Sequence, residues 1–388
     1  MDFEQSKKKL EKYGIELTLE QYKHNQNKTV ICGMSGGVDS YVSVLVLKLQ
    51  GYNTFGLFMR NWEENDENGV CAAEEDFKDV IKVCEKIDVP YYSVDFTKEY
   101  WDKVFSNFLE EYKEGHTPNP DILCNKEIKF NVFFQKAKEL GADYLATGHY
   151  CRKVVEGGRS CLVKGVDKGK DQTYFLYTMQ EKVLDEVLFP VGDLPKKVVR
   201  EIAADFELAT SAKKDSTGIC FIGERNFKEF LSNYIKSQAG EFVNLENNQK
   251  MGAHSGYCFY TIGQRKGLGI GGPGGPWFVA GKDVETNTVY VVEGEKHPAL
   301  YSQTLWFNEP SWVGDEPNFP IKCKAKARYR QPDQDCTVYK EGDLYRVEFE
   351  VPQRAIALRQ SVVFYDGEIC LGGGVIHKTG PTLFEQKA

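Results

Sequence analysis

Residues 29–40 read TVICGMSGGVDS, and this stretch decides the fold. The apolar residues 29–34 predict a short buried strand, and the apolar content of residues 38–50 predicts a helix directly after it. The turn between them holds Gly36 and Gly37, where the backbone can approach an anion closely and adopt positive φ. The N–H groups of such a turn converge at the positive end of the helix dipole. The stretch therefore predicts a phosphate-binding strand–turn–helix unit.

Outward from this unit, strand and helix patterns alternate through residues 28–150. Repeated strand–helix units imply a parallel sheet with helices on both faces. Short strands and many glycines follow residue 240, and residues 301–388 have the pattern of a compact all-β unit. The predicted fold class is α/β. It combines an N-terminal doubly wound parallel sheet, a small central α+β domain and a C-terminal all-β barrel.

The length of 388 residues favours two or three domains. The expected parts are an N-terminal extension (1–27), a nucleotide-binding catalytic domain (28–200), a central domain with a second cysteine (201–300) and a C-terminal barrel (301–388). Several Glu and no apolar core argue against a signal or transit peptide in the extension, which we predict to be helical or partly disordered, without an assigned role. No apolar run reaches the roughly 18–20 residues of a membrane span, so we expect no membrane partner.

The cysteine count and the net charge indicate the redox compartment and the kinds of ligand to expect. The 11 cysteines are an odd number in a long chain without an export signal, which favours a reducing cytoplasm over a disulfide framework. There are only six His and no CxxC pair, so a zinc site has little support. The net charge of -8 argues against bulk nonspecific binding of nucleic acid, but it does not exclude a local basic face.

The glycine turn differs from the common nucleotide loops. It lacks the GxxxxGK[ST] of a Walker loop and the GxGxxG of dinucleotide-binding folds. Ser35 and Ser40 offer hydroxyls, and Asp39 is a candidate to hold magnesium or to cap the helix. The alternative is that this stretch is only a glycine-rich turn between a strand and a helix and binds no nucleotide. SGGVDS resembles the loop of the PP-loop ATPases, which cleave ATP between the α- and β-phosphates; gripping the departing pyrophosphate stabilises its charge.

Two cysteines stand out because both lie in polar loops marked by Pro or Gly. Cys124 follows the stiff segment HTPNPDIL, and we expect it just ahead of a helix, where a thiol is pushed toward thiolate. Asp121, three residues earlier, is a candidate acid or base. Cys220 lies between Lys214 and Arg225 in KKDSTGICFIGER. The alternative for either cysteine is an ordinary packed thiol.

The segment IKCKAKARYR, residues 321–330, alternates cations with other side chains. On a strand this alternation places all five cations on one side. Aligned like charges repel one another, so an external polyanion such as a phosphate backbone is a reasonable explanation, with a solvated strand face as the alternative. The cations are Lys322, Lys324, Lys326, Arg328 and Arg330.

Taken together, these segments resemble the tRNA-specific 2-thiouridylase family, a PP-loop family, from about residue 28 to 375. The two cysteine strings in this order are far more specific than the nucleotide loop. The strings that carry the resemblance are GMSGGVDS, TPNPDILCNKEIKF, ATGHY, KDQTYFLY, KKDSTGICFIGERNF, YTIGQRKGLGIGG, RYRQ and CLGGG. The extension 1–27 has no counterpart in the family core.

The resemblance implies site residues. Cys124 is the expected nucleophile, Cys220 the persulfide carrier and Asp121 the acid or base. The expected ATP site comprises Gly33, Met34, Ser35, Gly36, Gly37, Val38, Asp39, Ser40, Met59 and Gly148. The target base is expected to meet Asn119, Pro120 and Asp121. Further tRNA contacts are expected at His149, Lys170, Asp171, Gln172, Tyr329, Arg330 and Gln360.

The expected reaction is 2-thiolation of the wobble uridine in tRNAs of the Lys, Glu and Gln class. ATP with Mg²⁺ adenylates the carbonyl oxygen, sulfur from a protein persulfide replaces it, and AMP and pyrophosphate leave. The expected partners are tRNA and a persulfide donor, either a cysteine desulfurase or a relay protein; the enzyme itself is expected to be a monomer.

Three alternatives stay open. One is a PP-loop ligase or amidotransferase acting on a small substrate, which needs no cysteine pair. Another is a non-catalytic tRNA-binding protein. The third is an iron–sulfur cluster held by Asp121, Cys124 and Cys220.

Overall fold

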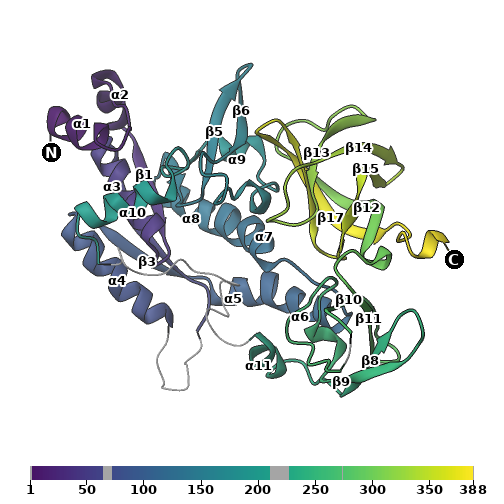
Figure 1. Cartoon of the computed structure of the whole chain (residues 1–388). Helices are drawn as coiled ribbons and strands as arrows, with labels where there is room; N and C mark the ends of the chain where they lie inside the picture. Colours follow the sequence, from purple (N-terminus) through teal and green to yellow (C-terminus); the bar gives the residue numbers. More distant parts are fainter. Residues whose placement is uncertain (1, 64–71, 210–226, 273, 388) are drawn as a thin grey trace. The chain divides into compact units, whose positions relative to one another are not determined.

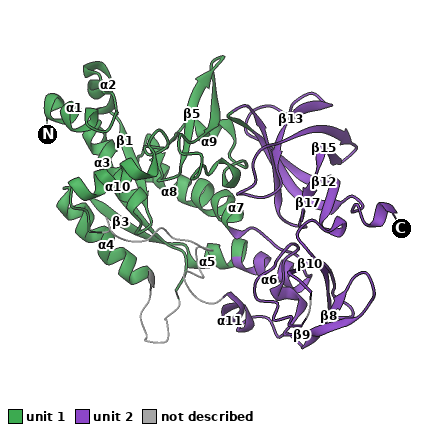
Figure 2. Cartoon of the chain, viewed as in Figure 1, with its two compact units in different colours: residues 1–104, 121–223, 368–370 green, residues 105–120, 224–367, 371–388 purple. Residues whose placement is uncertain are grey.

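The computed structural model of the chain describes residues 2–63, 72–209, 227–272 and 274–387 (Figure 1). Their contacts divide the chain into two units (Figure 2). Unit 1 comprises residues 1–104, 121–223 and 368–370, and unit 2 comprises residues 105–120, 224–367 and 371–388. The chain therefore passes from unit 2 to unit 1 between Pro120 and Asp121, inside residues 119–124, which carry the expected catalytic residues Asp121 and Cys124 and are called the catalytic loop below.

Unit 1 is built on a parallel sheet with strand order β3-β2-β1-β4-β7. Its strands are β1 (Thr29–Met34), β2 (Asn53–Arg60), β3 (Tyr91–Asp95), β4 (Tyr144–Ala146) and β7 (Val187–Leu188). β1 pairs in parallel with both β2 and β4, so the strand that leads into the glycine turn lies in the middle of the sheet. This arrangement confirms the predicted N-terminal parallel sheet.

Helices surround this sheet, and a hairpin follows it. The long helices are α3 (Val38–Leu49), α4 (Ala72–Lys86), α8 (Phe133–Glu139) and α10 (Lys196–Asp205). The shorter ones are α5 (Thr97–Tyr100), η1 (Trp101–Phe105), α7 (Pro120–Cys124), η2 (Asn125–Val132), η3 (Thr173–Phe175) and α9 (Glu181–Leu184). The hairpin consists of β5 (Cys151–Glu156) and β6 (Arg159–Lys164), joined by the turn of Gly157 and Gly158. Among the helices of the described residues, none combines the length and the apolar content that crossing a bilayer requires.

The N-terminal extension is helical and packed against unit 1. It forms α1 (Phe3–Glu11) and α2 (Leu19–Asn25), and a capping box between Thr18 and Gln21 starts the second helix. Leu10, Leu17 and Tyr22 belong to the same buried cluster as α3. The helical alternative is therefore confirmed, and the disordered one is wrong for residues 2–27.

Unit 2 contains a small mixed sheet with strand order β10-β11-β8-β9. Its strands are β8 (Gly240–Asn244), β9 (Lys250–His254), β10 (Trp277–Asp283) and β11 (Thr288–Glu293). The helices of this unit include α6 (Ser106–Lys113) and α11 (Phe227–Ser232). Short 3-10 turns are η4 (Tyr257–Phe259), η5 (Pro298–Leu300) and η6 (Glu385–Lys387).

The C-terminal strands form the predicted barrel in the order β12-β15-β14-β13-β16-β17, and a pairing of β12 with β17 closes it. They are β12 (Tyr301–Trp312), β13 (Ile321–Lys326), β14 (Gln334–Glu341), β15 (Leu344–Arg354), β16 (Ser361–Asp366) and β17 (Ile369–Thr379). Aromatic side chains fill the interior, among them the buried Phe307, Phe349 and Phe364. Closure leaves no open edge between the first and last strand.

Candidate active site

The glycine turn lies at the carboxyl end of β1, where ligands of open parallel sheets bind. Gly36 has a φ of +74°, which suits glycine, and Gly37 caps the amino end of α3. The hydroxyl of Ser40 accepts a hydrogen bond from the backbone N–H of Ser35 at 3.3 Å and donates one to the carbonyl oxygen of Gly37 at 2.9 Å. The turn is therefore held by its own side chains and presents the amino end of a buried helix.

Gly148 approaches this turn closely. A Cβ at Gly148 would lie 2.9 Å from the carbonyl carbon of Asp39 and 2.9 Å from the nitrogen of Ser40. Met59, another expected contact to adenosine, lies on β2, which pairs with β1. Gly148, in the segment after β4, therefore packs directly on the turn, and Met59 lies on a strand next to the one that carries it.

A buried lysine lies at this turn, and sequence reasoning missed it. The Nζ of Lys196 donates to both carboxylate oxygens of Asp39, at 2.6 and 2.8 Å, and the hydroxyl of Tyr150 donates to the same carboxylate at 2.6 Å. The Lys196 side chain is only 10% exposed. Its backbone N–H donates to the carboxylate of Asp167 at the start of α10. A turn without its own lysine thus acquires one from a helix 157 residues later.

The local structure around Cys124 differs from the prediction. Helix α7 begins at Pro120, and Cys124 is its last residue, with φ -60° and ψ -44°, continuing into η2. Cys124 therefore directly precedes η2, as expected, but it also lies inside a helical stretch whose amino end is at Pro120, which the sequence did not predict. Proline at the first helical position was the available signal. Cys124 is 2% exposed, whereas Asp121, one turn earlier, is partly exposed.

The other cysteines divide into two sets. Cys220 and its loop lie outside the described residues, as does Cys71. The nine described cysteines are all free thiols. Burial raises the pKa of Cys84 to about 11 and raises the pKa values of Cys32 and Cys151 as well, which keeps these three thiols protonated. They fit ordinary packing.

The expected RNA contacts on unit 1 are mostly turned inward. His149 is buried, its Nδ1 lies 2.8 Å from the hydroxyl of Thr147, and burial holds its pKa well below the usual 6.5. The Asp171 carboxylate is buried and accepts hydrogen bonds from Gly165 and Thr173. The Gln172 side chain accepts from the backbone N–H of Tyr150. Lys170 is partly exposed. Direct contact of these four residues with tRNA stays a prediction.

The basic segment does not place five cations on one strand face. Strand β13 ends at Lys326, before Arg328 and Arg330. Lys324 pairs with Asp335 at 3.1 Å, and Lys326 lies 3.7 Å from Asp333. Carboxylates across the β13–β14 hairpin thus balance two of the five cations, and that part of the prediction is wrong.

Arginines gather beyond the end of β13, around a pocket of about 400 Å³. Arg330 is exposed, and the Arg354 guanidinium lies over the ring of Phe278 at 5.1 Å. The pocket is lined by Tyr301, Arg328, Arg330, Gln331, Pro332, Gln334, Pro352, Gln353 and Arg354. Tyr329 is partly exposed next to it. Guanidinium and amide groups of this kind suit a phosphate.

Three family models match the chain. A tRNA methyl transferase HUP domain matches residues 28–224, a tRNA methyl transferase PRC-barrel domain matches residues 228–293, and an aminomethyltransferase beta-barrel domain matches residues 302–376.

Curated relatives match nearly the whole chain. The tRNA-specific 2-thiouridylase MnmA of Protochlamydia amoebophila is 56% identical over 93% of this chain and 96% of its own length. The protein of the same name from Alkaliphilus oremlandii is 58% identical over 89% of this chain and 96% of its own length. Among solved structures, the U34-tRNA thiolase NcsA from Methanococcus maripaludis aligns with a TM-score of 0.37 and 18% identity, over 59% of this chain and 69% of that one.

Proposed function

Because the chain belongs to the tRNA-specific 2-thiouridylase family, we propose that it replaces the carbon-2 oxygen of a tRNA uridine with sulfur and consumes ATP in doing so. The observation that carries the proposal is the glycine turn of residues 33–40 at the carboxyl end of a central parallel strand, in the same unit as Cys124. The substrate is the wobble uridine of tRNAs of the Lys, Glu and Gln class. The enzyme works in the cytoplasm as a monomer.

The first step activates a poor leaving group. The carbonyl oxygen on carbon 2 attacks the α-phosphorus of ATP, an O–P bond forms, and pyrophosphate departs. Backbone N–H groups around Gly36 and Gly37, and the ammonium of Lys196, stabilise the charge that develops on the departing pyrophosphate. ATP enters as its magnesium complex. The carboxylate of Asp39 already accepts three hydrogen bonds from Lys196 and Tyr150, so we assign to it the role of holding the lysine.

The second step transfers sulfur. A cysteine desulfurase or relay protein loads Cys220 as a persulfide. The terminal sulfur attacks carbon 2, the carbon–oxygen bond breaks, and AMP leaves with that oxygen. The S–S bond of the persulfide breaks by one of two routes. In the first, Cys124 attacks the Sγ of Cys220, the sulfide that is released is the sulfur that attacks carbon 2, and the Cys124–Cys220 disulfide needs a reductant. In the second, Cys124 attacks carbon 2 and displaces AMP, the terminal sulfur displaces Cys124 from carbon 2, and Cys124 then attacks the Sγ of Cys220, which leaves the sulfur on the base and forms the same disulfide. Asp121 takes and returns the proton. The target base must leave its stack, as anticodon-loop bases readily do.

An iron–sulfur cluster is the remaining alternative for the two thiols. Its proposed ligands are Asp121, Cys124 and Cys220, of which only the first two are described. An iron and sulfide assay with an absorption spectrum of anaerobically purified protein decides between the cluster and the persulfide route.

Mass spectrometry of anticodon nucleosides tests the proposal. The wild-type chain is expected to form 2-thiouridine with ATP and a persulfide donor, and Cys124→Ala and Cys220→Ala are expected to lose it by roughly 10³-fold or more. Cys161→Ala, which replaces a partly exposed thiol on β6, is the matched control and keeps the activity. Thiolation that persists in both variants refutes the assignment; AMP release without tRNA but with a small acid identifies a ligase.

A further inference from the structure

The segment that leads into the catalytic loop is tied to the C-terminal barrel inside unit 2. It comprises residues 116–118 and runs directly into Asn119, Pro120 and Asp121. Its partner is the turn of residues 355–360, between β15 and β16. Both segments belong to unit 2, so the contacts between them lie within one body.

Hydrogen bonds join the two segments at the backbone. The side-chain Nε2 of Gln360 donates to the carbonyl oxygens of Thr117 at 2.7 Å and Pro118 at 3.2 Å. The backbone N–H of Thr117 donates to the carbonyl oxygen of Leu358 at 3.4 Å. One glutamine therefore satisfies two successive carbonyls at the entrance of the catalytic loop, which fixes their direction.

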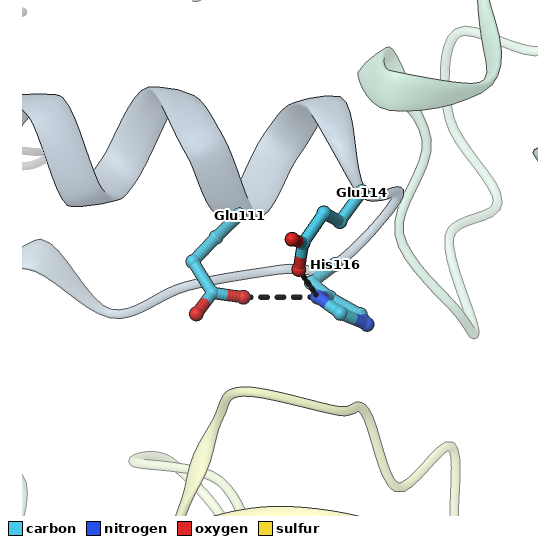
Figure 3. A group of neighbouring side chains, drawn as sticks. All are labelled: Glu111, Glu114 and His116. Atoms are coloured by element: carbon cyan, nitrogen blue, oxygen red, sulfur yellow. Dashed lines mark hydrogen bonds and ion pairs between the residues drawn. The ribbon is translucent and has the colours of Figure 1, made fainter.

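An ion network supports the same segment from the other side. The Nε of Arg359 lies 3.1 Å from Oε2 of Glu111, and Nδ1 of His116 lies 2.9 Å from the same oxygen. The Glu111 side chain is only 12% exposed, so the pair is partly shielded from water. Figure 3 shows Glu111, at the carboxyl end of α6, and Glu114 pointing toward His116, which follows the helix.

The acidic residues with His116 also have the spacing of a metal site, since Glu111, Glu114 and His116 place ligand atoms within 4.8 Å of one another. Arg359 argues against a metal. Its guanidinium already balances Glu111, and a divalent cation at that oxygen would face a fixed positive charge about 3 Å away. The cluster is therefore better explained as an anchor for the loop.

The barrel turn is itself held in an unusual backbone conformation. Ala355 and Arg359 adopt left-handed φ values of 54° and 66°. Residues other than glycine keep such a conformation only where the surroundings over-determine it, and these sites cluster at functional positions. The turn is fixed by hydrogen bonds from Arg359 N–H to the carbonyl of Ile376 and from Ile376 N–H to the carbonyl of Gln360. The left-handed Arg359 thus presents its guanidinium to Glu111 from a rigid base.

We propose that Arg359 and Gln360 are positioning residues for thiolation, which hold residues 116–118 and so fix the direction in which the chain runs into Asn119 and Pro120, the expected contacts of the target base. The inference rests on the proposed function. It gives Gln360 a role inside the protein in addition to the expected contact with tRNA, and it makes the barrel a support for the chemistry as well as for RNA binding.

The test measures the single-turnover thiolation rate and the affinity for tRNA of wild type, Arg359→Gln, Arg359→Lys, Glu111→Gln and the double variant Glu111→Gln/Arg359→Gln. Arg359→Gln is expected to slow thiolation about 10- to 30-fold while the Kd for tRNA changes less than about threefold, because a displaced loop affects chemistry more than docking. Arg359→Lys is expected to restore most of the rate. The double variant is expected to be no slower than Arg359→Gln, because both single changes remove the same ion pair.

A matched control is Arg346→Gln. Arg346 lies on β15 of the same barrel and forms comparable ion pairs with Glu341 and Glu348, away from the loop. The thiolation rate of Arg346→Gln is expected to stay at the wild-type value. If Arg359→Gln does not fold, Gln360→Met removes the donor to Thr117 and Pro118 and is expected to slow thiolation in the same way.

Two results overturn the inference. One is a rate within twofold of wild type for Arg359→Gln or Gln360→Met. The other is a double variant whose loss is the product of the two single losses. The proposed function is tested separately, by whether the wild-type protein forms 2-thiouridine at all.

Discussion

Lys196 places a positive charge beside the glycine turn. A buried ammonium needs a partner, and the Asp39 carboxylate provides one at 2.6 Å. That partner also fixes the ammonium beside the turn, where phosphate oxygens of ATP are expected. Asp39 and Tyr150 therefore act through the lysine.

Replacing Lys196 by Met keeps the length of the side chain and removes the charge. We expect kcat/KM for ATP to fall about 100-fold, as when one preorganised donor is removed from a site of developing negative charge. Pyrophosphate release from ATP in the presence of tRNA measures it. Lys197→Met, whose lysine is 88% exposed one position later, is the control. Equal kcat/KM values in the two variants would contradict the assignment.

His149 makes stability depend on pH. Burial, reinforced by the nearby Lys129, lowers its pKa well below 6.5, so the folded state keeps the ring neutral while the unfolded state binds a proton below pH 6.5. The stabilisation is therefore complete above pH 6.5 and is lost as the pH falls. The free energy of unfolding of the wild type is therefore expected to fall between pH 7.5 and pH 5.5 by more than that of His149→Gln. Urea unfolding of wild type and His149→Gln at both pH values measures this pH dependence. The same change in the free energy of unfolding in both proteins would refute the role of His149.

At the scale of single elements, local patterns predicted the strands and turns well. The buried strand and the glycine turn depend on neighbouring residues, and both are found. Two elements were placed wrongly. The sequence does not predict the start of α7, because proline is common both in loops and at the first position of a helix. It predicts a strand longer than β13, because the alternation of cations with other side chains continues past Lys326, where the strand ends.

The fit between Gly148 and the turn gives a prediction at this scale. Gly148→Ala places a Cβ 2.9 Å from backbone atoms of Asp39 and Ser40, which cannot rotate away, so the turn must shift. We expect KM for ATP to rise about tenfold or more. Gly281→Ala on β10, where the new Cβ meets ordinary contacts at 3.6 Å or more, is expected to leave KM unchanged. An unchanged KM in Gly148→Ala would show that the approach is not critical.

At the scale of the whole molecule, the sequence predicted the succession of parallel sheet, central domain and barrel, because each has its own periodicity. Contacts between residues far apart in the chain could not be predicted in that way. Lys196 reaches Asp39 across 157 positions, and Arg359 reaches Glu111 from another domain of the sequence. No local pattern encodes such pairs. The proposed limits of the domains, at residues 200 and 300, stay predictions.

The arginine pocket beyond β13 is a predicted binding site for phosphates of tRNA. If Arg330 and Arg354 bind phosphates, the double variant Arg330→Gln/Arg354→Gln binds tRNA more weakly and with a shallower salt dependence. The slope of log Kobs against log salt is expected to fall by about 0.7–0.9 for each phosphate that the variant no longer neutralises. Lys340→Gln/Lys378→Gln, at exposed barrel positions outside the pocket, is the control. Equal slopes in the two double variants would exclude the pocket as a phosphate site.

The most direct test of the account follows one oxygen atom. A tRNA whose target uridine carries ¹⁸O on carbon 2 is incubated with the wild-type chain, ATP and a persulfide donor, and the AMP is analysed by mass spectrometry. Adenylation of the carbonyl oxygen predicts one ¹⁸O atom in the phosphate of AMP for each 2-thiouridine formed. Unlabelled AMP accompanying full thiolation would contradict it.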